Sequence, residues 1–135
     1  MITNADCTIY NKYFLLGIEK YQRTQVPDVK WEARKAANVM QSGLIAADSV
    51  TVYIPFARDA NYVKPKAWQA LTTKTSKWTL QDGDFMVKGL VADEIGTGFT
   101  ITALKAKYDD VVQIRSVDTM DAGSLYMQHW QLGCN

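Results

Sequence analysis

The residues that could do hydrolytic chemistry lie together near the end of the chain. His129, the only histidine, follows Ser124 by five positions, and Asp118 and Asp121 precede both. Serine, histidine and aspartate can serve as a nucleophile, its base and the group that orients the base. If Ser124 and His129 share one strand, their odd separation places them on opposite faces and about 17 Å apart. A serine needs its base within about 3 Å, so the pattern predicts an ordinary strand residue at His129, and no enzyme.

Carboxylates also occur in pairs, which raises the question of a metal site. The pair Asp109–Asp110 and the pair Asp118 and Asp121 could in principle bind a hard cation. The second pair, however, is more typical of a turn in which an aspartate side chain bonds to its own backbone. Two cysteines without clustered histidines make no zinc site. We therefore expect neither a metal ion nor a cofactor.

Length and composition are those of one folded domain. The chain has 135 residues, 47% of them hydrophobic and 21% charged, with a net charge of +1, so we treat residues 1–135 as a single domain. This balance gives no general case for nucleic acid or a membrane surface, and no stretch has the length of a membrane span or the pattern of a signal peptide. Cys7 and Cys134 are expected to be free, half-buried thiols rather than a disulfide.

Alternating apolar and polar residues predict a chain made mostly of strands. Val29, Trp31 and Ala33 would face a core, while Lys30 and Glu32 would face away. Pro27 and Asp28 are expected to form a short connection between two strands. The expected strands are residues 7–13, 19–26, 29–33, 48–56, 85–91, 111–117 and 125–132.

Two regions depart from the strand pattern. Residues 34–47 fit either a short helical face or a strand with a loop. Thr100 is a candidate N-cap for a helix ending near Tyr108, with Phe99 and Leu104 as its hydrophobic staple. The fold class that follows is mainly β: a small single-domain β-barrel or sandwich with one short helix and one long loop.

The long loop, residues 57–78, carries most of the positive charge of the protein. Five cationic side chains and one carboxylate leave it a net charge of +4. Pro65 could open one helical turn within it, with Trp68 and Leu71 on one side. A connection of this length in so small a domain is usually functional or disordered, although a merely solvated loop would also account for the charge.

Several stretches of the chain carry a family resemblance. They are ITNADCTIYNKY at the start, ADSVTVYIPF followed by NYVKPKAW in the middle, GDFMVKG, and YDDVVQIRSVDTMDAGSLYMQHWQLG near the end. Over most of its length the chain resembles a family of small structural proteins of tailed bacteriophages, described as minor capsid or head–tail joining proteins.

The resemblance implies a connector role in the phage neck. Joining proteins of this size are similar to stoppers, small β-barrels that form a ring, typically a hexamer, and complete the head. The implied partners are portal and adaptor proteins on the head side, a tail terminator or tail tube on the other, and packaged double-stranded DNA bound without sequence preference. The implied location is the virion, after synthesis in the host cytoplasm. A long loop from each subunit would project inward and help close the DNA channel.

The basic loop is the candidate for that role. Its cationic residues would face the phosphate backbone or acidic neighbours in the ring; they are Arg58, Lys64, Lys66, Lys74 and Lys77. Its aromatic residues Tyr62, Trp68 and Trp78 are candidates for packing the loop or for contacts between subunits. The two tryptophans could instead be core, which is also the expectation for Trp31 and Trp130.

Two further functions stay open at this point. A tail-terminator ring protein of the same particle would have a similar size and the same lack of catalytic residues. A non-catalytic carbohydrate- or peptide-binding β-module would use some of the four Trp and seven Tyr to line a groove, and it predicts several exposed tryptophans on one face.

Overall fold

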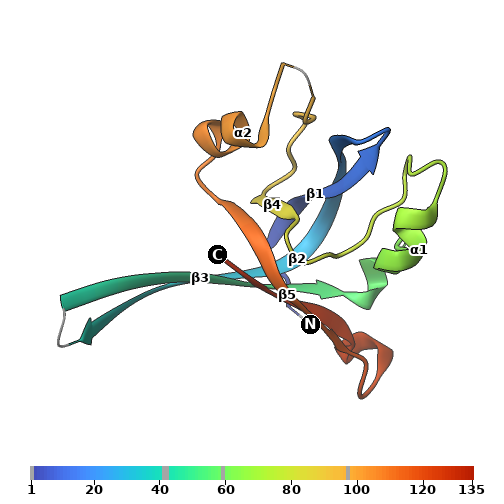
Figure 1. Ribbon diagram of the computed structural model, residues 1–135. Helices are drawn as coiled ribbons and strands as arrows, with labels where there is room; N and C mark the ends of the chain where they lie inside the picture. Colours follow the sequence, from blue (N-terminus) through green and yellow to red (C-terminus); the bar gives the residue numbers. More distant parts are fainter. Residues whose placement is uncertain (1, 41–42, 59, 97) are drawn as a thin grey trace.

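A closed antiparallel β-barrel forms the body of the protein. The computed structural model describes residues 2–40, 43–58, 60–96 and 98–135, with the backbone alone between residues 34 and 48. Within these residues six strands close the barrel in the order β1–β2–β3–β6–β5–β4 (Figure 1). The strands are β1 (Ala5–Leu15), β2 (Ile18–Met40), β3 (Gly43–Pro55), β4 (Phe85–Lys88), β5 (Val111–Met120) and β6 (His129–Cys134). The predicted mainly-β fold is confirmed, and of the two alternatives left open, barrel and sandwich, the structure has the barrel.

Short helices occupy the connections between the strands. The α-helices in the described residues are α1 (Pro65–Ala70) and α2 (Ile101–Lys107), and the 3-10 turns are η1 (Phe56–Arg58) and η2 (Leu125–Met127). The helical turn that Pro65 was expected to open is α1, so the described residues contain two short α-helices where the fold class named one. The predicted start of α2 is confirmed: the Thr100 hydroxyl accepts a hydrogen bond from the Ala103 N–H at 3.2 Å.

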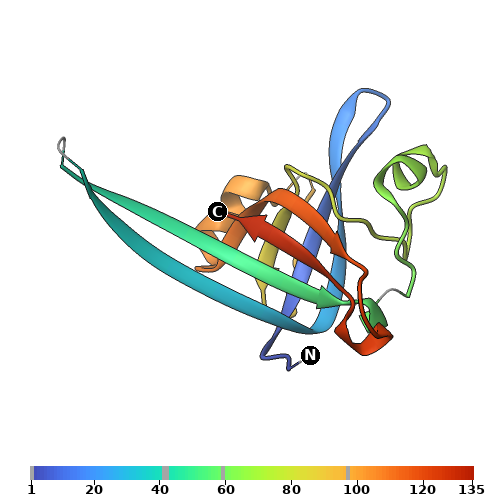
Figure 2. The ribbon, with the colours of Figure 1, turned by 90° about the horizontal axis from the view of Figure 1, so that it is seen from below.

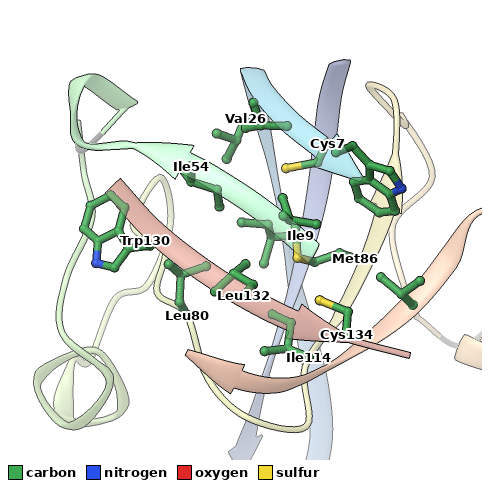
Figure 3. Packing of buried hydrophobic residues seen from close by; sticks show 14 of the residues in the cluster. Cys7, Ile9, Val26, Ile54, Leu80, Met86, Ile114, Trp130, Leu132 and Cys134 are labelled. Carbon is green, nitrogen blue, oxygen red and sulfur yellow. The ribbon is translucent and has the colours of Figure 1, made fainter. Parts of the chain in front are cut away.

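The barrel interior is filled from every strand. Alternate residues of β6, Trp130, Leu132 and Cys134, are buried, as period-two geometry requires. They meet Ile9, Ile54, Leu80, Met86 and Ile114 from other parts of the chain (Figure 3). Each such aliphatic side chain contributes roughly 1.5–3 kcal/mol on leaving water, and this cluster is the main reason that the barrel closes.

Strand β1 is buried on both faces. Cys7 and Ile9 point into the barrel, whereas Tyr10 belongs to a second cluster with Phe85, Val87, Val91 and Leu104. Leu104 comes from α2, which covers the outer face of the sheet, and Phe99 packs against the same cluster. The continuous burial from Cys7 to Asn11 is explained by this cover.

Residues 18–40 are one strand, so the predicted break at Pro27–Asp28 was wrong. The pairing of β1 with β2 jumps from Ala5↔Val29 to Cys7↔Val26, and Asp28 has a φ of 56°. These are the features of a β-bulge, which accommodates a proline without ending the strand. The Asp28 N–H is satisfied by the Asp6 carboxylate at 3.0 Å.

The β2–β3 hairpin continues far beyond the barrel as a two-stranded arm (Figure 2). Pairing between β2 and β3 runs from Lys30↔Tyr53 to Met40↔Gly43. In contrast, β6 pairs with β3 only from Val50 onward, and β1 pairs with β2 no further than Val29. We call residues 34–40 and 43–49 the arm. The helical alternative for residues 34–47 is overturned wherever the backbone is described; Gln41 and Ser42 lie outside the described residues.

Both cysteines are free and more deeply buried than expected, at 0% exposure for Cys7 and 5% for Cys134. They belong to the same core cluster (Figure 3). Burial raises the pKa of the Cys7 thiol and raises that of Cys134 to about 12, because an ionised thiolate is poorly solvated among apolar side chains.

Candidate functional site

The basic segment 57–78 folds back onto the barrel instead of projecting from it; its residue Asp59 lies outside the described residues. Tyr62 forms a parallel β-bridge with Trp78, whose ring N–H donates to the Ala60 carbonyl at 2.9 Å. The Trp68 ring N–H donates to the Lys77 carbonyl at 3.1 Å. Both tryptophans are buried, at 0% and 2% exposure, so they pack the segment and leave no ring surface for a neighbouring subunit.

Two of the predicted cationic residues are engaged within the subunit. The Lys74 ammonium donates to the Leu71 carbonyl at 2.8 Å and lies over the rings of Tyr13 and Trp68, at 5.1 and 5.3 Å from their centroids. The Arg58 guanidinium pairs with Asp28 at 3.3 Å. Their positive charge therefore helps to hold the segment in place.

The remaining predicted cations face outward to different degrees. Lys64 and Lys66 are exposed, at the start of α1, and Lys77 is half-buried. The basic surface available to a partner is thus smaller than the net charge of the segment indicates, and Lys64 and Lys66 are its main members.

An aromatic pocket lies between this segment and the β5–β6 end of the barrel. Its volume is about 560 Å³, and its lining includes Phe56, Tyr62, Val117 and Trp130, with Lys64 and Asp121 also present. The Tyr62 and Trp130 rings are 4.5 Å apart, as are those of Phe56 and Trp130. All four tryptophans of the chain are buried, so the exposed tryptophan face predicted for a carbohydrate-binding module is not formed.

A buried polar cluster fixes the end of the basic segment to β1. The Asp84 carboxylate accepts hydrogen bonds from the Asn11 and Gln81 side-chain amides, each at 2.8 Å, and from the Lys12 backbone N–H at 3.1 Å. Asn11 also bonds to both backbone groups of Thr79. Burial raises the pKa of Asp84, and the hydrogen bonds offset part of that rise.

Replacing this carboxylate should destabilise the barrel. Asp84→Ala leaves the Lys12 N–H without its partner, and an unsatisfied buried donor costs about 1–3 kcal/mol. Because the folded protein raises the pKa of Asp84, the stabilisation linked to its proton is complete below pH 3.8 and is lost as the pH rises through the folded-state pKa. The destabilisation by Asp84→Ala should thus be larger in acid than at neutral pH. Urea unfolding in acid and at neutral pH measures the loss of unfolding free energy caused by Asp84→Ala. Replacement of its exposed neighbour, Asp82→Ala, is the control. An equal loss at the two pH values would contradict the linkage to the Asp84 proton.

The hydrolase residues are not brought together. Ser124 precedes η2, so Ser124 and His129 do not share one strand as the sequence argument assumed. Nδ1 of His129 contacts the Met127 carbonyl at 2.9 Å, and its ring packs on Tyr53 with centroids 5.5 Å apart. Among the described residues no hydrogen bond joins Ser124 to His129, and His129 has the neighbours of an ordinary strand residue.

Metal ligands and membrane-spanning helices were also sought in the part of the chain that the structure describes. No three histidine, cysteine or acidic side chains gather there as metal ligands would. None of the described helices has the length and apolar character needed to cross a bilayer.

Two groups of exposed apolar side chains were not predicted from the sequence. One is the tip of the β1–β2 hairpin, with Phe14, Leu15, Leu16 and Ile18, and the other is the β5–β6 connection, with Met120, Leu125, Tyr126 and Met127. The stretch FLLGI was an available signal for the first, because a turn between two strands rarely needs so many large apolar residues.

The fold defines the class of protein: a small closed antiparallel barrel with a projecting β-hairpin arm and a helical segment packed on its side. Within that class, the chain belongs to the family of unknown function DUF6751, whose model matches residues 2–135. No curated protein matches the chain, and no solved structure matches it.

Proposed function

We propose that this protein is a structural subunit of a tailed-phage neck, a stopper-like head–tail connector that assembles as a ring, completes the head and helps to close the DNA channel. The proposal combines the sequence resemblance with one structural observation, the arm. An isolated two-stranded ribbon is at best marginally stable in water. The arm therefore suits a subunit whose neighbours supply the missing surface.

The composition of the arm indicates what kind of surface it meets. No charged residue occurs from Ala36 to Ala47, whereas exposed strand edges in monomeric proteins are commonly protected by charge. This charge-free outer part of the arm is poorly suited to phosphate and well suited to other protein surfaces. In this proposal the arm, and not segment 57–78, is the element that reaches into the ring.

Segment 57–78 keeps a smaller role in the proposal. Lys64 and Lys66, the exposed cations, would attract the phosphate backbone of packaged DNA without sequence readout. Lys74 and Arg58 hold the segment together, so their loss would be felt first as instability of the segment.

A nonsense mutation of this gene in its parent phage tests the proposal, with lysates examined by electron microscopy. A connector gives tailless heads that have lost their DNA beside complete free tails, and the wild-type gene supplied in trans restores normal particles. Full heads beside tails of irregular length would instead identify a tail terminator. Normal infectious particles from the mutant would refute a role in the neck.

A further inference from the structure

The tip of the β1–β2 hairpin exposes an apolar surface that folding does not explain. Phe14 is 61% exposed, Leu15 52%, Leu16 95% and Ile18 61%. Strand β4 pairs with β1 only as far as Tyr10, so the hairpin extends beyond the sheet. We call residues 14–18 the tip.

The turn at the tip places a leucine in a strained backbone conformation. Leu15 pairs with Ile18, and the two residues between them, Leu16 and Gly17, have φ values of 52° and 77°. Such turns favour Asn and Gly, and a leucine with positive φ is strained. A side chain that destabilises its own turn and is almost fully exposed is better explained by an intermolecular contact.

A second apolar patch lies at the β5–β6 connection. Leu125 is 73% exposed, Tyr126 71% and Met127 59%. Both ribbon views place this connection well away from the tip, with segment 57–78 between them (Figures 1 and 2). It adjoins the aromatic pocket through Asp121 and Val117, which line that pocket. We call residues 118–127 the β5–β6 patch.

The charges around the two surfaces are complementary. Lys12 and Lys20 flank the tip, and with Glu19 they give residues 12–20 a net charge of +1. Asp118 and Asp121 give the β5–β6 patch a net charge of −2. None of these four flanking residues forms an ion pair among the described residues.

We infer that the tip of one copy of this chain docks on the β5–β6 patch of a second copy. Two different patches on one subunit are what a head-to-tail contact requires, and such a contact repeats until a ring closes. The contact joins apolar side chains at its centre and opposite charges at its rim, the usual arrangement of a protein interface. The inference rests on the proposed ring function, for which it names the partner surface.

Self-association of the purified chain, followed by sedimentation velocity over a concentration series, tests this contact. The double variant Leu15→Thr with Leu16→Asn places strand- and turn-favouring residues at the tip, so it should fold at least as well as the parent. Its dissociation constant should rise at least about tenfold, since a few residues near the centre of an interface carry most of the binding energy. Leu90→Ser, which replaces a side chain that is 52% exposed outside both patches, should leave association unchanged.

Charge reversal identifies the partner surface. Lys12→Glu with Lys20→Glu should weaken association, and mixing this variant with Asp118→Lys and Asp121→Lys should restore it. A chain that stays monomeric, or charge reversal without rescue, overturns the inference. The parent protein could instead fail to self-associate and bind anionic lipid vesicles, with that binding lost in the tip variant. This result would assign the tip to a membrane surface and would also overturn the inferred contact. A neck phenotype in the nonsense mutant together with monomeric protein would leave the connector proposal standing and refute this contact alone.

Discussion

Trp68→Ala is expected to lower the free energy of unfolding by about 3–5 kcal/mol, the range for deletion of a buried aromatic side chain. Trp68 is fully buried, and its ring contacts Tyr13 edge-on at 5.8 Å between centroids. Its removal leaves a cavity under α1 and deprives the Lys77 carbonyl of a donor. It also removes one of the two rings beneath the Lys74 ammonium. Segment 57–78 should detach from the barrel.

Chemical denaturation measures the change in the free energy of unfolding. Limited proteolysis detects detachment of segment 57–78 from the barrel. Trp68→Phe retains a ring but loses the ring N–H, so its cost should be smaller. Lys66→Ala, at an exposed position of the same helix, should change stability by no more than about 0.5 kcal/mol. A cost below about 1 kcal/mol for Trp68→Ala would mean that segment 57–78 is not held by this side chain.

Removal of the arm should abolish function and leave the barrel intact. Ala33 and Val50 are directly paired, so an Asn-Gly turn placed between them can replace residues 34–49. The free energy of unfolding should change by no more than about 1 kcal/mol, because the arm pairs with no other strand and a shorter connection costs little entropy. If the arm meets neighbouring subunits, the shortened protein will not complement the nonsense mutant.

Two point variants keep the full length of the arm and test only the contacts that it would make with neighbouring subunits. Ala46→Lys introduces a charge into the uncharged stretch and should impair complementation, whereas Ala46→Ser should be tolerated. Complementation of the nonsense mutant to wild-type titre by the shortened protein would show that the arm has no role in the particle. An unfolded shortened protein would show instead that the arm stabilises the barrel.

The strand content was predictable because alternation is a local signal. Val50, Val52 and Ile54 alternate with polar residues, and they lie on β3 as expected. The bulge at Asp28 was not predictable, because whether Pro27 ends a strand or bends it depends on a partner strand elsewhere in the sequence. The Asp6 carboxylate that satisfies the Asp28 N–H is 22 residues away. The length of the arm is likewise set by distant parts of the chain, because it depends on where β1 and β6 stop pairing with β2 and β3.

The candidate site was predictable in composition but not in geometry. The charges in the sequence locate the basic segment. They do not show that Lys74 bonds to the carbonyls of its own segment or that Arg58 pairs with Asp28. Burial of Trp68 and Trp78 required the segment to fold back, which depends on Asn11 and Asp84 bonding far along the chain. The exposed tip, by contrast, was visible in the letters FLLGI.

The burial of Cys7 and Cys134 has a consequence for the durability of the protein. Thiolate, not thiol, is the form that reacts with oxidants and disulfides. With raised pKa values and almost no exposed surface, both sulfurs stay protonated and out of reach at neutral pH. In the folded chain these two thiols are therefore protected from oxidants in solution. Loss of these thiols to oxidation would thus follow unfolding of the barrel and would not precede it.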